Sequence, residues 1–558
     1  MSLKTNFSLK CCFIFILIIL PIHSFCQETE QDSDPSQFIT RHVFIEMKDG
    51  VRLSTDIFLP PAEGKYPVVL VRTPYDKKIL EKSGALYTAN NYVLVTQDCR
   101  GKFQSEGKFY PFINERADGL TTVEWIRRQP WANGKIGGWG GSYVGYTQWA
   151  IADVLDAITP ELTSADMYGL IYSGGIFSLA TAFNWGLIVD SQTINRVKPD
   201  KILASYWYLP LSAADDSTTK DIAYINDWLT HEQCDGFWQN QNQREFARAP
   251  VLSIAGWYDI FLWPQIIDFQ SLNEDIRAQS RMIIGPWCHG KQSWDNNYVG
   301  SEKTGNKTNW VAGFLSEKLK DQSFDYKDPV YKDRIYNLFV MQRNEYFACN
   351  TWPPKSVKLT PYYFGPDHSL STAVPVSNGS IEYTYDPSNP FPNLGGTFLG
   401  LNVGAAVQND NLYRHDQLIF DTEVLESELI LLGPISASLY ISSDVPSTDF
   451  YISLHDVMPN DTIINIQESG KKIKILPGIN KVDLSVWATG YQLNEGHKLR
   501  VVVTSALFPR FNRNLNANEP IFSARTKRIA HQAVYYGSHP SSVTLPILII
   551  KDGQRFEE

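Results

Sequence analysis

A glycine-rich stretch with one serine sets the strongest constraint on how this chain can fold. The stretch spans 135–145 and reads Lys-Ile-Gly-Gly-Trp-Gly-Gly-Ser-Tyr-Val-Gly, with the serine at position 142. A strand that turns sharply at a serine and continues into a helix exposes a nucleophilic hydroxyl at the edge of a parallel sheet. Gly140 stands where such a turn crowds the backbone, but Val144 replaces the usual second glycine, which comes one residue later. The stretch therefore fits either a nucleophile elbow or a plain glycine-rich turn.

The length and charge of the chain restrict its class. With 558 residues it is long enough for two or three domains, because single hydrophobic cores rarely grow beyond about 250–300 residues. The formal net charge is -10, and no basic block occurs that could neutralise phosphates. We therefore expect no nucleic-acid partner.

The first 26 residues are typical of an export signal. Two lysines precede a short apolar run from Cys11 to Ile22, and Ser24 and Cys26 are small residues just before a cleavage site. The run is too short for a stable membrane span. A lipid anchor at Cys26 is the alternative, but bulky Phe25 occupies a position where such anchors need a small residue. We expect a soluble exported protein, periplasmic or secreted.

Four cysteines follow the leader, and their scattered spacing matches no zinc site. They are Cys99, Cys234, Cys288 and Cys349. One or two disulfides would be compatible with an oxidising compartment, but the spacing defines no pairing. We predict no metal and no cofactor.

Strands and helices alternate on both sides of a helical segment. Apolar strands at 66–71 and 92–97 and an amphipathic helix over 115–128 precede the serine stretch, and the strand rhythm resumes at 251–256. Such alternation predicts an α/β core with a mostly parallel sheet. Between 167 and 248 the pattern is helical and aromatic, which predicts a cap inserted over the carboxyl edge of that sheet.

The remaining chain has a different character. After a linker near Trp352, short strand-like runs alternate with turns of Gly, Pro, Asn and Asp, which is typical of an all-β sandwich. The predicted domain organisation is a signal peptide 1–26, the first part of the core 27–166, a helical cap 167–248, the second part of the core 249–350 and an all-β domain 351–558.

Chain order supplies a base and an acid for the serine. In α/β hydrolases they follow the serine in the order acid, histidine, each on a loop after a strand. His289 comes just after the strand that ends at Gly285, whereas His231 lies in the predicted cap with no strand before it. Asp259 follows the strand at 251–256 in the same way. The alternatives are a structural role for the histidine and a helix cap for the aspartate.

An oxyanion hole needs two hydrogen-bond donors. The backbone N–H of Tyr143, directly after the serine, is one candidate. No run of glycines follows the early strand at 66–71 to supply the second, but Tyr75 does follow it and carries a phenol O–H. On position alone Tyr75 is either that donor or a packed core tyrosine.

Eight short motifs occur in order along the chain: R-T-P-Y-D-K at 72–77, Q-D-C-R-G-K-F-Q-S-E-G at 97–107, G-G-S-Y-V-G at 140–145, G-W-Y-D at 256–259, G-P-W-C-H at 285–289, S-T-D-F at 447–450, G-H-K-L-R at 496–500 and F-P-R-F-N-R-N-L-N at 508–516. Taken together, these motifs resemble the cocaine esterase family (CocE/NonD hydrolases), within a wider X-Pro dipeptidyl-peptidase group that includes glutaryl-cephalosporin acylases and α-amino acid ester hydrolases. The resemblance spans nearly the whole mature chain.

The resemblance implies an α/β-hydrolase core with an inserted helical cap and a C-terminal jelly roll. The nucleophile elbow of this family reads G-x-S-Y-x-G, which accounts for a second glycine at position 145, one residue later than in the usual motif. It implies a nucleophile at Ser142, an acid at Asp259, a base at His289 and an oxyanion donor at Tyr75. Asp98, Arg100 and Glu106 fit internal salt bridges better than catalysis.

The function expected is an exported serine hydrolase that cleaves a small-molecule ester or amide through an acyl-enzyme. Trp257, Tyr258 and Phe261 are the predicted pocket residues. The resemblance implies that members acting on α-amino acid esters place carboxylates close to the acid, to hold the substrate ammonium. Here the four residues directly after Asp259 are Ile-Phe-Leu-Trp, which argues against the alternatives of an X-Pro dipeptidyl-peptidase or an α-amino acid ester hydrolase. The non-enzyme alternative is an exported carbohydrate- or partner-binding protein with an idle hydrolase core. The sequence defines no oligomeric state.

Overall fold

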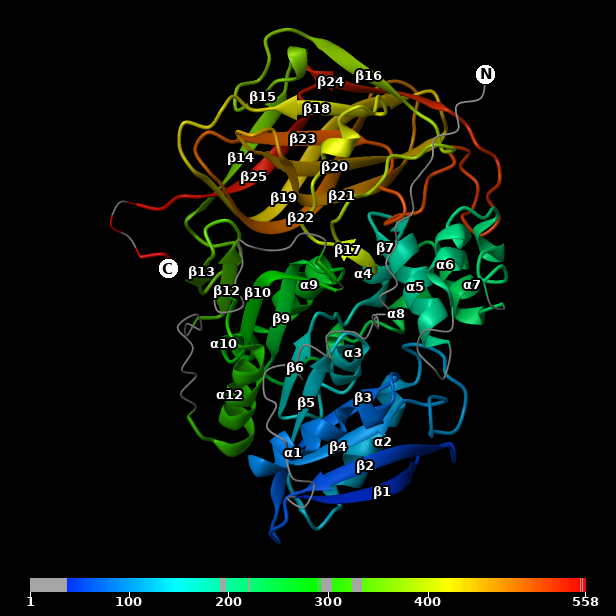
Figure 1. Ribbon diagram of the computed structural model, residues 1–558, viewed down its shortest axis with the longest axis vertical. Coiled ribbons are helices and arrows are strands. Elements are labelled where there is room, and N and C mark those ends of the chain that lie inside the picture. The colour runs from blue at the N-terminus through cyan, green and yellow to red at the C-terminus, as the bar shows by residue number, and fades with distance from the viewer. Residues whose placement is uncertain are drawn as a thin grey trace.

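The computed structural model describes residues 38–190, 197–218, 221–289, 291–292, 304–323, 334–551, 553 and 555–558. The predicted leader 1–26, with the alternative anchor at Cys26, lies outside them. The described chain forms a catalytic core, a helical cap beside it and a β domain above both (Figure 1). In the described ranges no helix is both long and apolar enough to cross a membrane.

The core is built on a sheet of ten described strands. In sheet order they are β1 (Ile39–Glu46), β2 (Arg52–Leu59), β4 (Val93–Asp98), β3 (Tyr66–Thr73), β5 (Ala132–Gly141), β6 (Ala157–Glu161), β9 (Leu252–Tyr258), β10 (Arg281–Cys288), β12 (Tyr336–Val340) and β13 (Glu345–Cys349). The middle of the sheet, from β4 to β12, is parallel, and antiparallel strands close both ends. The mixed sheet confirms the predicted α/β class.

Burial explains why the central strands read as continuous apolar runs. Every residue of β4 and of β9 is buried, as expected for parallel strands covered on both faces. The core helices are α1 (Glu81–Ala89), α2 (Glu115–Arg127), α3 (Tyr143–Trp149), α9 (Leu262–Ser271), α10 (Glu274–Ala278) and α12 (Lys307–Lys320). They lie around the sheet and connect its strands (Figure 1).

The cap is inserted between β6 and β9. Its helices are α4 (Met167–Ile171), α5 (Leu179–Val189), α6 (Pro199–Ser205), α7 (Ala223–Thr230) and α8 (Gly236–Gln239). A small hairpin, β7 (Tyr172–Ser173) and β8 (Ile176–Phe177), interrupts the segment 167–248 that the sequence pattern predicted as helical. The turn of this hairpin contacts the β domain, because Lys472 N–H donates to the Gly174 carbonyl at 3.0 Å.

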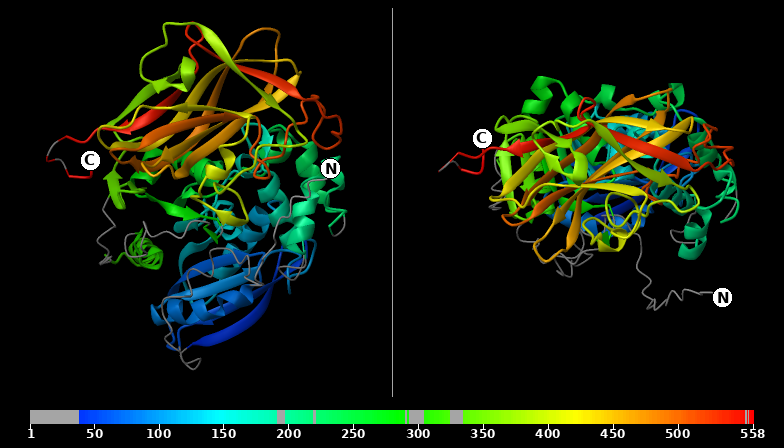
Figure 2. Two further views of the ribbon diagram at one scale, coloured as in Figure 1. Left: turned by 45° about the horizontal axis from the view of Figure 1, so that its top comes forward. Right: turned by 90° about the horizontal axis from the view of Figure 1, so that it is seen from above.

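The C-terminal part is a sandwich of two sheets, which confirms the predicted all-β domain. One sheet holds β15 (Leu370–Ser371), β14 (Val357–Phe364), β25 (Ser542–Leu548), β19 (Leu429–Ser443), β24 (Ala530–Tyr536) and β16 (Gly379–Tyr385), with β22 (Asn480–Leu493) also paired to β19; the other holds β18 (Gln417–Asp421), β23 (Lys498–Thr504), β20 (Ser447–Val457) and β21 (Ile463–Lys474). The sandwich lies over the core and cap in both views of Figure 2.

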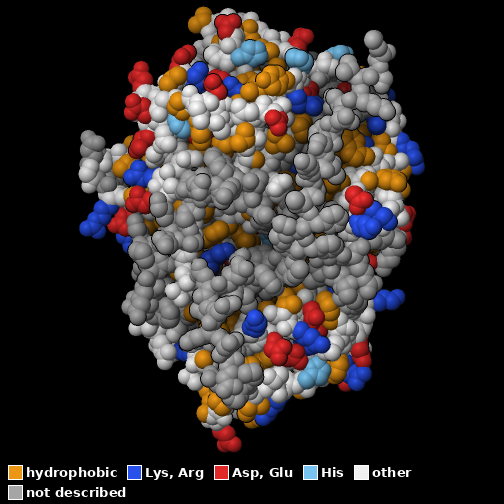
Figure 3. Space-filling model, in the orientation of Figure 1, with side chains coloured by type: hydrophobic (Ala, Val, Ile, Leu, Met, Phe, Trp, Pro, Cys, Tyr) orange, Lys and Arg blue, Asp and Glu red, His pale blue; other side chains and the backbone are white. Residues whose placement is uncertain are grey.

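Two features of the surface and the thiols complete the fold. Acidic and basic side chains are interspersed on the described surface shown in Figure 3, so no block of one sign gathers on that face. All four cysteines that follow the leader are free thiols.

The β domain also reaches the core through β17 (Leu401–Val403), which pairs with β11 (Lys291–Gln292) just after His289.

The core and the β domain are also joined along β12 and β22. Met341 N–H donates to the Gly490 carbonyl at 2.9 Å, and the Trp257 indole N–H donates to the Phe339 carbonyl at 2.6 Å. A Cβ at position 490 would lie 2.5 Å from that same carbonyl oxygen and 2.9 Å from the Trp257 ring. Glycine is therefore required where the two domains meet.

We predict that Gly490→Ala destabilises the protein by about 1–3 kcal/mol, because the added methyl has no room between rigid backbone and a buried indole. The midpoint of thermal unfolding measures this effect. Gly236→Ala is the matched control, since a Cβ there meets no atom within 4 Å. Equal midpoints for the two variants would contradict the prediction.

Candidate active site

Ser142 lies at the turn between β5 and α3 with a strained backbone. Its φ is 56° and its ψ is -130°, a combination that non-glycine residues rarely adopt. The turn is held by backbone hydrogen bonds, in which Ser142 N–H donates to Glu161 O at 2.9 Å and Gly145 N–H donates to Ser142 O at 2.9 Å. The stretch is thus a strand–turn–helix elbow and not a plain glycine-rich turn.

The spacing of the glycines around Ser142 follows from packing. A Cβ at position 140 would lie 2.5 Å from the Val144 side chain, and one at position 145 would lie 2.2 Å from Thr163 Cγ2. The first turn of α3 contacts the segment after β6 at residue 145, three positions beyond the serine. Glycine is therefore required at 145, whereas Val144 is accommodated.

Ser142, His289 and Asp259 form one continuous hydrogen-bonded chain. His289 Nε2 lies 3.1 Å from Ser142 Oγ, and His289 Nδ1 lies 2.7 Å from Asp259 Oδ2. The other oxygen of Asp259, Oδ1, accepts the backbone N–H of Phe261 at 2.8 Å. The Asp259 carboxylate is fully buried, so these hydrogen bonds replace the water that it lacks.

The sheet explains how residues far apart in the chain meet. Ser142 follows β5, Asp259 follows β9 and His289 follows β10, and these strands are parallel. Their carboxyl ends lie at one edge of the sheet, so the loops after them converge. β9 and β10 extend to Tyr258 and Cys288, further than the apolar runs predicted, and each side chain follows its strand directly.

Tyr75 follows β3 at the same edge. Its hydroxyl is a neighbour of the Ser142 side chain and of the Tyr143 backbone N–H, both of which act to lower the pKa of the phenol against the larger effect of burial. The indole N–H of Trp185, on cap helix α5, donates to this hydroxyl at 2.9 Å. Burial raises the pKa of the Tyr75 phenol above its usual range, so the proton stays available for donation at neutral pH. The two predicted oxyanion donors therefore lie beside the serine hydroxyl.

The side chain of Tyr143 has a structural role, distinct from its backbone. Its hydroxyl donates to Glu115 Oε1 at 2.7 Å and accepts the Phe112 N–H at 3.0 Å. Glu115 is paired in turn with buried Arg72, 2.9 Å away. Burial is the main cause that raises the pKa of the Tyr143 phenol, and the nearby negative charge of Glu115 raises it further. This network fixes the first residue of α3, and with it the N–H that faces the site.

The three charged residues of the 97–107 motif form ion pairs, largely buried at Asp98 and Arg100, as predicted, but exposed at Glu106. Asp98 lies 3.5 Å from Lys77 Nζ. Arg100 contacts Asp118 at 2.5 Å, and Glu106 pairs with Arg52. None of the three lies among the residues that line the cavity at Ser142.

A cavity opens beside Ser142 and His289 and is lined almost entirely by apolar side chains. The core, the cap and the β domain all contribute to its wall: Phe112, Ser142, Tyr143, Tyr146, Thr163, Met167, Leu170, Ile171, Thr181, Ala182, Trp185, Ile260, Phe261, His289 and Leu399. None of the described residues that line it is Asp or Glu.

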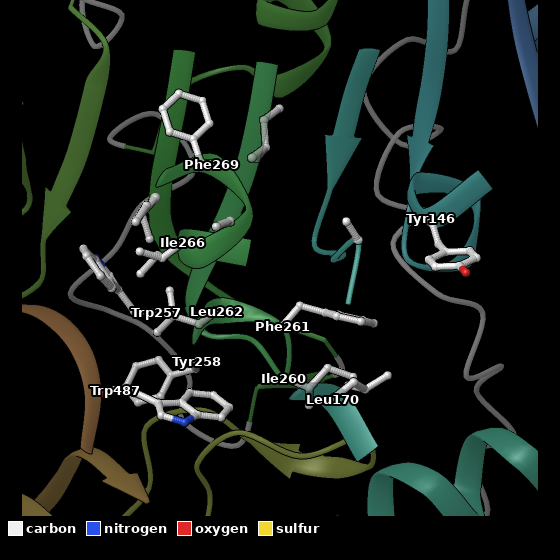
Figure 4. Close-up of a cluster of buried hydrophobic side chains, with 14 of the residues drawn as sticks. Tyr146, Leu170, Trp257, Tyr258, Ile260, Phe261, Leu262, Ile266, Phe269 and Trp487 are labelled. Atoms are coloured by element: carbon white, nitrogen blue, oxygen red, sulfur yellow. The ribbon is translucent and has the colours of Figure 1, made fainter. Parts of the chain in front are cut away.

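Of the three predicted pocket residues, only Phe261 lines this cavity, with its ring centroid 5.4 Å from that of His289. The prediction for Trp257 and Tyr258 is wrong. Tyr258 lies beside Trp487 of β22, on the opposite side of the cluster from Phe261 (Figure 4). The Tyr258 hydroxyl donates to Asn465 O at 3.0 Å, and Trp257 packs on Gly490. Both residues anchor the β domain to the core.

Comparisons with known proteins identify the family. The family model of the X-Pro dipeptidyl-peptidase (S15 family) matches residues 49–291, and that of the X-Pro dipeptidyl-peptidase C-terminal non-catalytic domain matches residues 336–544. The chain is 30% identical to the cocaine esterase of Rhodococcus sp. (strain MB1 Bresler), over 92% of this chain and 99% of that esterase. This chain belongs to the S15 family. It is a serine hydrolase, an esterase or a peptidase.

Solved structures of S15-type hydrolases share this fold. An aminopeptidase from a marine sediment Thaumarchaeota archaeon superposes with a TM-score of 0.80 at 21% identity, covering 94% of this chain and 98% of that chain. An α-amino acid ester hydrolase superposes with a TM-score of 0.77 at 22% identity, covering 93% and 99%. Both likenesses confirm the arrangement of a catalytic domain followed by a β domain.

Sequence reasoning missed two contributors to this S15 site. Trp185 contacts Tyr75 from the cap, and Leu399 reaches the cavity from a loop of the β domain. Neither residue belongs to a motif. Trp185 is one aromatic among several in a helical segment, and Leu399 precedes the short strand β17, so only the tertiary structure places them.

Proposed function

We propose that this S15-family chain is an exported hydrolase that cleaves an ester or amide bond through an acyl-enzyme, with Ser142 as nucleophile. The observation that carries the proposal is the buried hydrogen-bond chain from Asp259 through His289 to Ser142, at 2.7 Å and 3.1 Å. Serine is a weak nucleophile unless a base takes its proton, and the base works best when a carboxylate orients it.

In the first half of the reaction Ser142 Oγ attacks the substrate carbonyl carbon. His289 Nε2 takes the serine proton, while Asp259 holds Nδ1–H and stabilises the imidazolium that forms. The Tyr75 O–H and the Tyr143 N–H stabilise the negative charge on the carbonyl oxygen. His289 then gives its proton to the departing alcohol or amine, and the acyl group stays bonded to Ser142.

The second half repeats these steps with water. His289 removes a proton from the water as its oxygen attacks the acyl carbon, and the same two donors stabilise the second oxyanion. The proton then returns from His289 to Ser142 Oγ, and the carboxylic acid leaves. The enzyme is restored without a cofactor in the cycle.

We predict that Ser142→Ala lowers kcat on an activated ester by about a millionfold, as in a comparable catalytic triad, and abolishes labelling by a fluorophosphonate probe. Hydrolysis of p-nitrophenyl butyrate and mass analysis of the labelled peptide measure both effects. Ser388→Ala, at an exposed turn of the β domain, is the control that keeps full activity. Near-normal turnover by Ser142→Ala would overturn the mechanism.

The cavity favours an acyl group without a positive charge. Its described lining is apolar and carries no carboxylate, so a substrate ammonium would be buried without a partner, which costs several kcal/mol. The aromatic rings of Phe112, Phe261 and Trp185 provide contact area for an alkyl or aryl acyl chain. An uncharged acyl ester or amide is therefore the proposed substrate, in preference to an amino-acid ester or an X-Pro dipeptide.

A matched pair of esters tests this preference. Methyl phenylacetate and phenylglycine methyl ester differ only by the α-ammonium group, and we predict that the first has a kcat/KM at least about tenfold higher, given the cost of an unpaired buried charge. Alanyl-proline p-nitroanilide should be turned over no faster than background. A preference for phenylglycine methyl ester, or release of nitroaniline from the dipeptide, would contradict the proposed substrate class.

Export is supported by the lysines and the apolar run of residues 1–26. We predict that the mature chain begins at Gln27 and is recovered outside the cytoplasm, as periplasmic or secreted protein. Cell fractionation and the intact mass of the purified chain test this. A chain that keeps Met1 and stays in the cytoplasm would contradict export, and a lipid-modified Cys26 would contradict a soluble product.

A further inference from the structure

We propose that Trp185 is a positioning residue for the oxyanion hole, because its indole N–H holds the Tyr75 hydroxyl in the orientation that points its proton at the reacting carbonyl. This inference rests on the proposed function. The contact that carries it is the 2.9 Å hydrogen bond from Trp185 Nε1 to Tyr75 Oη. It joins the cap to the loop after β3, two parts of the chain that are 110 residues apart.

The Trp185 ring is held rigidly. It stacks on the Tyr143 ring at a centroid distance of 5.7 Å and an interplanar angle of 18°, and on the Trp228 ring at 6.0 Å and 22°. The Phe112 ring lies 5.4 Å away, also nearly parallel. These contacts fix the direction of the indole N–H, so little conformational freedom is lost when it binds Tyr75.

The chemistry of a phenol explains why this contact matters. A phenol oxygen carries one proton and can accept from two donors. Trp185 is a donor only, so its hydrogen bond occupies an acceptor site of Tyr75 and leaves the O–H to point elsewhere. The Tyr143 N–H is also a neighbour of this oxygen, but as the second oxyanion donor it must serve the substrate. The Trp185 bond is then the contact that remains to orient Tyr75.

The same bond strengthens Tyr75 as a donor. Accepting a hydrogen bond polarises a hydroxyl and makes its own proton a better donor, more so where water is excluded. Tyr75 is only 3% exposed, so no solvent competes for its oxygen. Loss of the indole N–H would leave the hydroxyl free to rotate about its C–O bond.

Helix α5 is itself anchored to the β domain. Asn184 Nδ2 donates to Leu399 O at 2.6 Å, and Ala180 N–H donates to Pro509 O at 3.1 Å. The placement of Trp185 therefore depends on cap and β domain together. The cap acts as part of the oxyanion machinery and not only as a cover for the acyl cavity.

Trp185 also lines the cavity, so a simple wall role must be distinguished from positioning. A wall residue changes KM or acyl preference, and its removal has the same effect whether or not Tyr75 carries a hydroxyl. A positioning residue changes kcat with little change in KM, and its removal has no effect once that hydroxyl is gone. A double-mutant cycle separates the two roles.

The cycle uses Trp185→Phe, Tyr75→Phe and the double variant, assayed on p-nitrophenyl butyrate. We expect Trp185→Phe to lower kcat about three- to tenfold with KM within about twofold, and Tyr75→Phe to lower kcat about 100- to 1000-fold. The double variant should match Tyr75→Phe alone. Trp238→Phe is the matched control, because this buried cap tryptophan donates its indole N–H to the His231 carbonyl at 2.7 Å and is not among the residues that line the cavity, and it should keep wild-type kcat.

A second variant guards against misfolding. Benzothienyl-alanine at position 185 keeps the shape of tryptophan but lacks the N–H, and it should reproduce the loss in kcat. Equal losses from the Trp185 change in both Tyr75 backgrounds, or equal behaviour of Trp185→Phe and Trp238→Phe, would overturn the inference. If the wild-type enzyme neither hydrolysed the ester nor reacted with a fluorophosphonate, the proposed function would be overturned, and this inference with it.

Discussion

The strained backbone at Ser142 is the constraint on which the rest of the site depends. A φ of 56° at a non-glycine residue costs about 1–3 kcal/mol and persists only where the surroundings hold it. Here β6 holds it through Glu161 O, and Thr163 packs so closely on α3 that position 145 must be glycine. If this packing loosened, the serine hydroxyl would lose its position relative to His289.

The remaining site residues reach Ser142 because parallel strands end at one edge. Asp259 and His289 follow neighbouring strands, and Tyr75 follows β3. The buried Asp259 carboxylate is satisfied by the Phe261 N–H and by His289, so burying it costs little and it orients the histidine. The cap and the β domain then close the cavity and exclude water, which strengthens each of these polar contacts.

Patterns along the chain were enough to predict much of the fold, and the exceptions have physical causes. The buried run of β4 and the amphipathic helix α2 follow from hydrophobic period alone. Strand β6 was not predicted, because it is short and Pro160 interrupts its pattern. Strand β19 is longer than the short strands expected of this domain, because a register shift between Pro434 and Ser436 accommodates the proline without ending the strand.

The sequence by itself determined the chemistry, because it contains a serine at a turn, followed in the chain by an acid and a base. Each of the three follows a strand directly, so parallel pairing of these strands places all three at one edge of the sheet. The sequence also determined the family, through ordered motifs over the whole chain. Only the tertiary structure decided the walls of the site. Trp257 and Tyr258 face the β domain and Phe261 faces the cavity, because the direction of each side chain depends on how strand β9 ends and what packs on it. Trp185 meets Tyr75 only because an inserted helix is fixed by a domain that comes later in the chain, a long-range contact that no local pattern encodes.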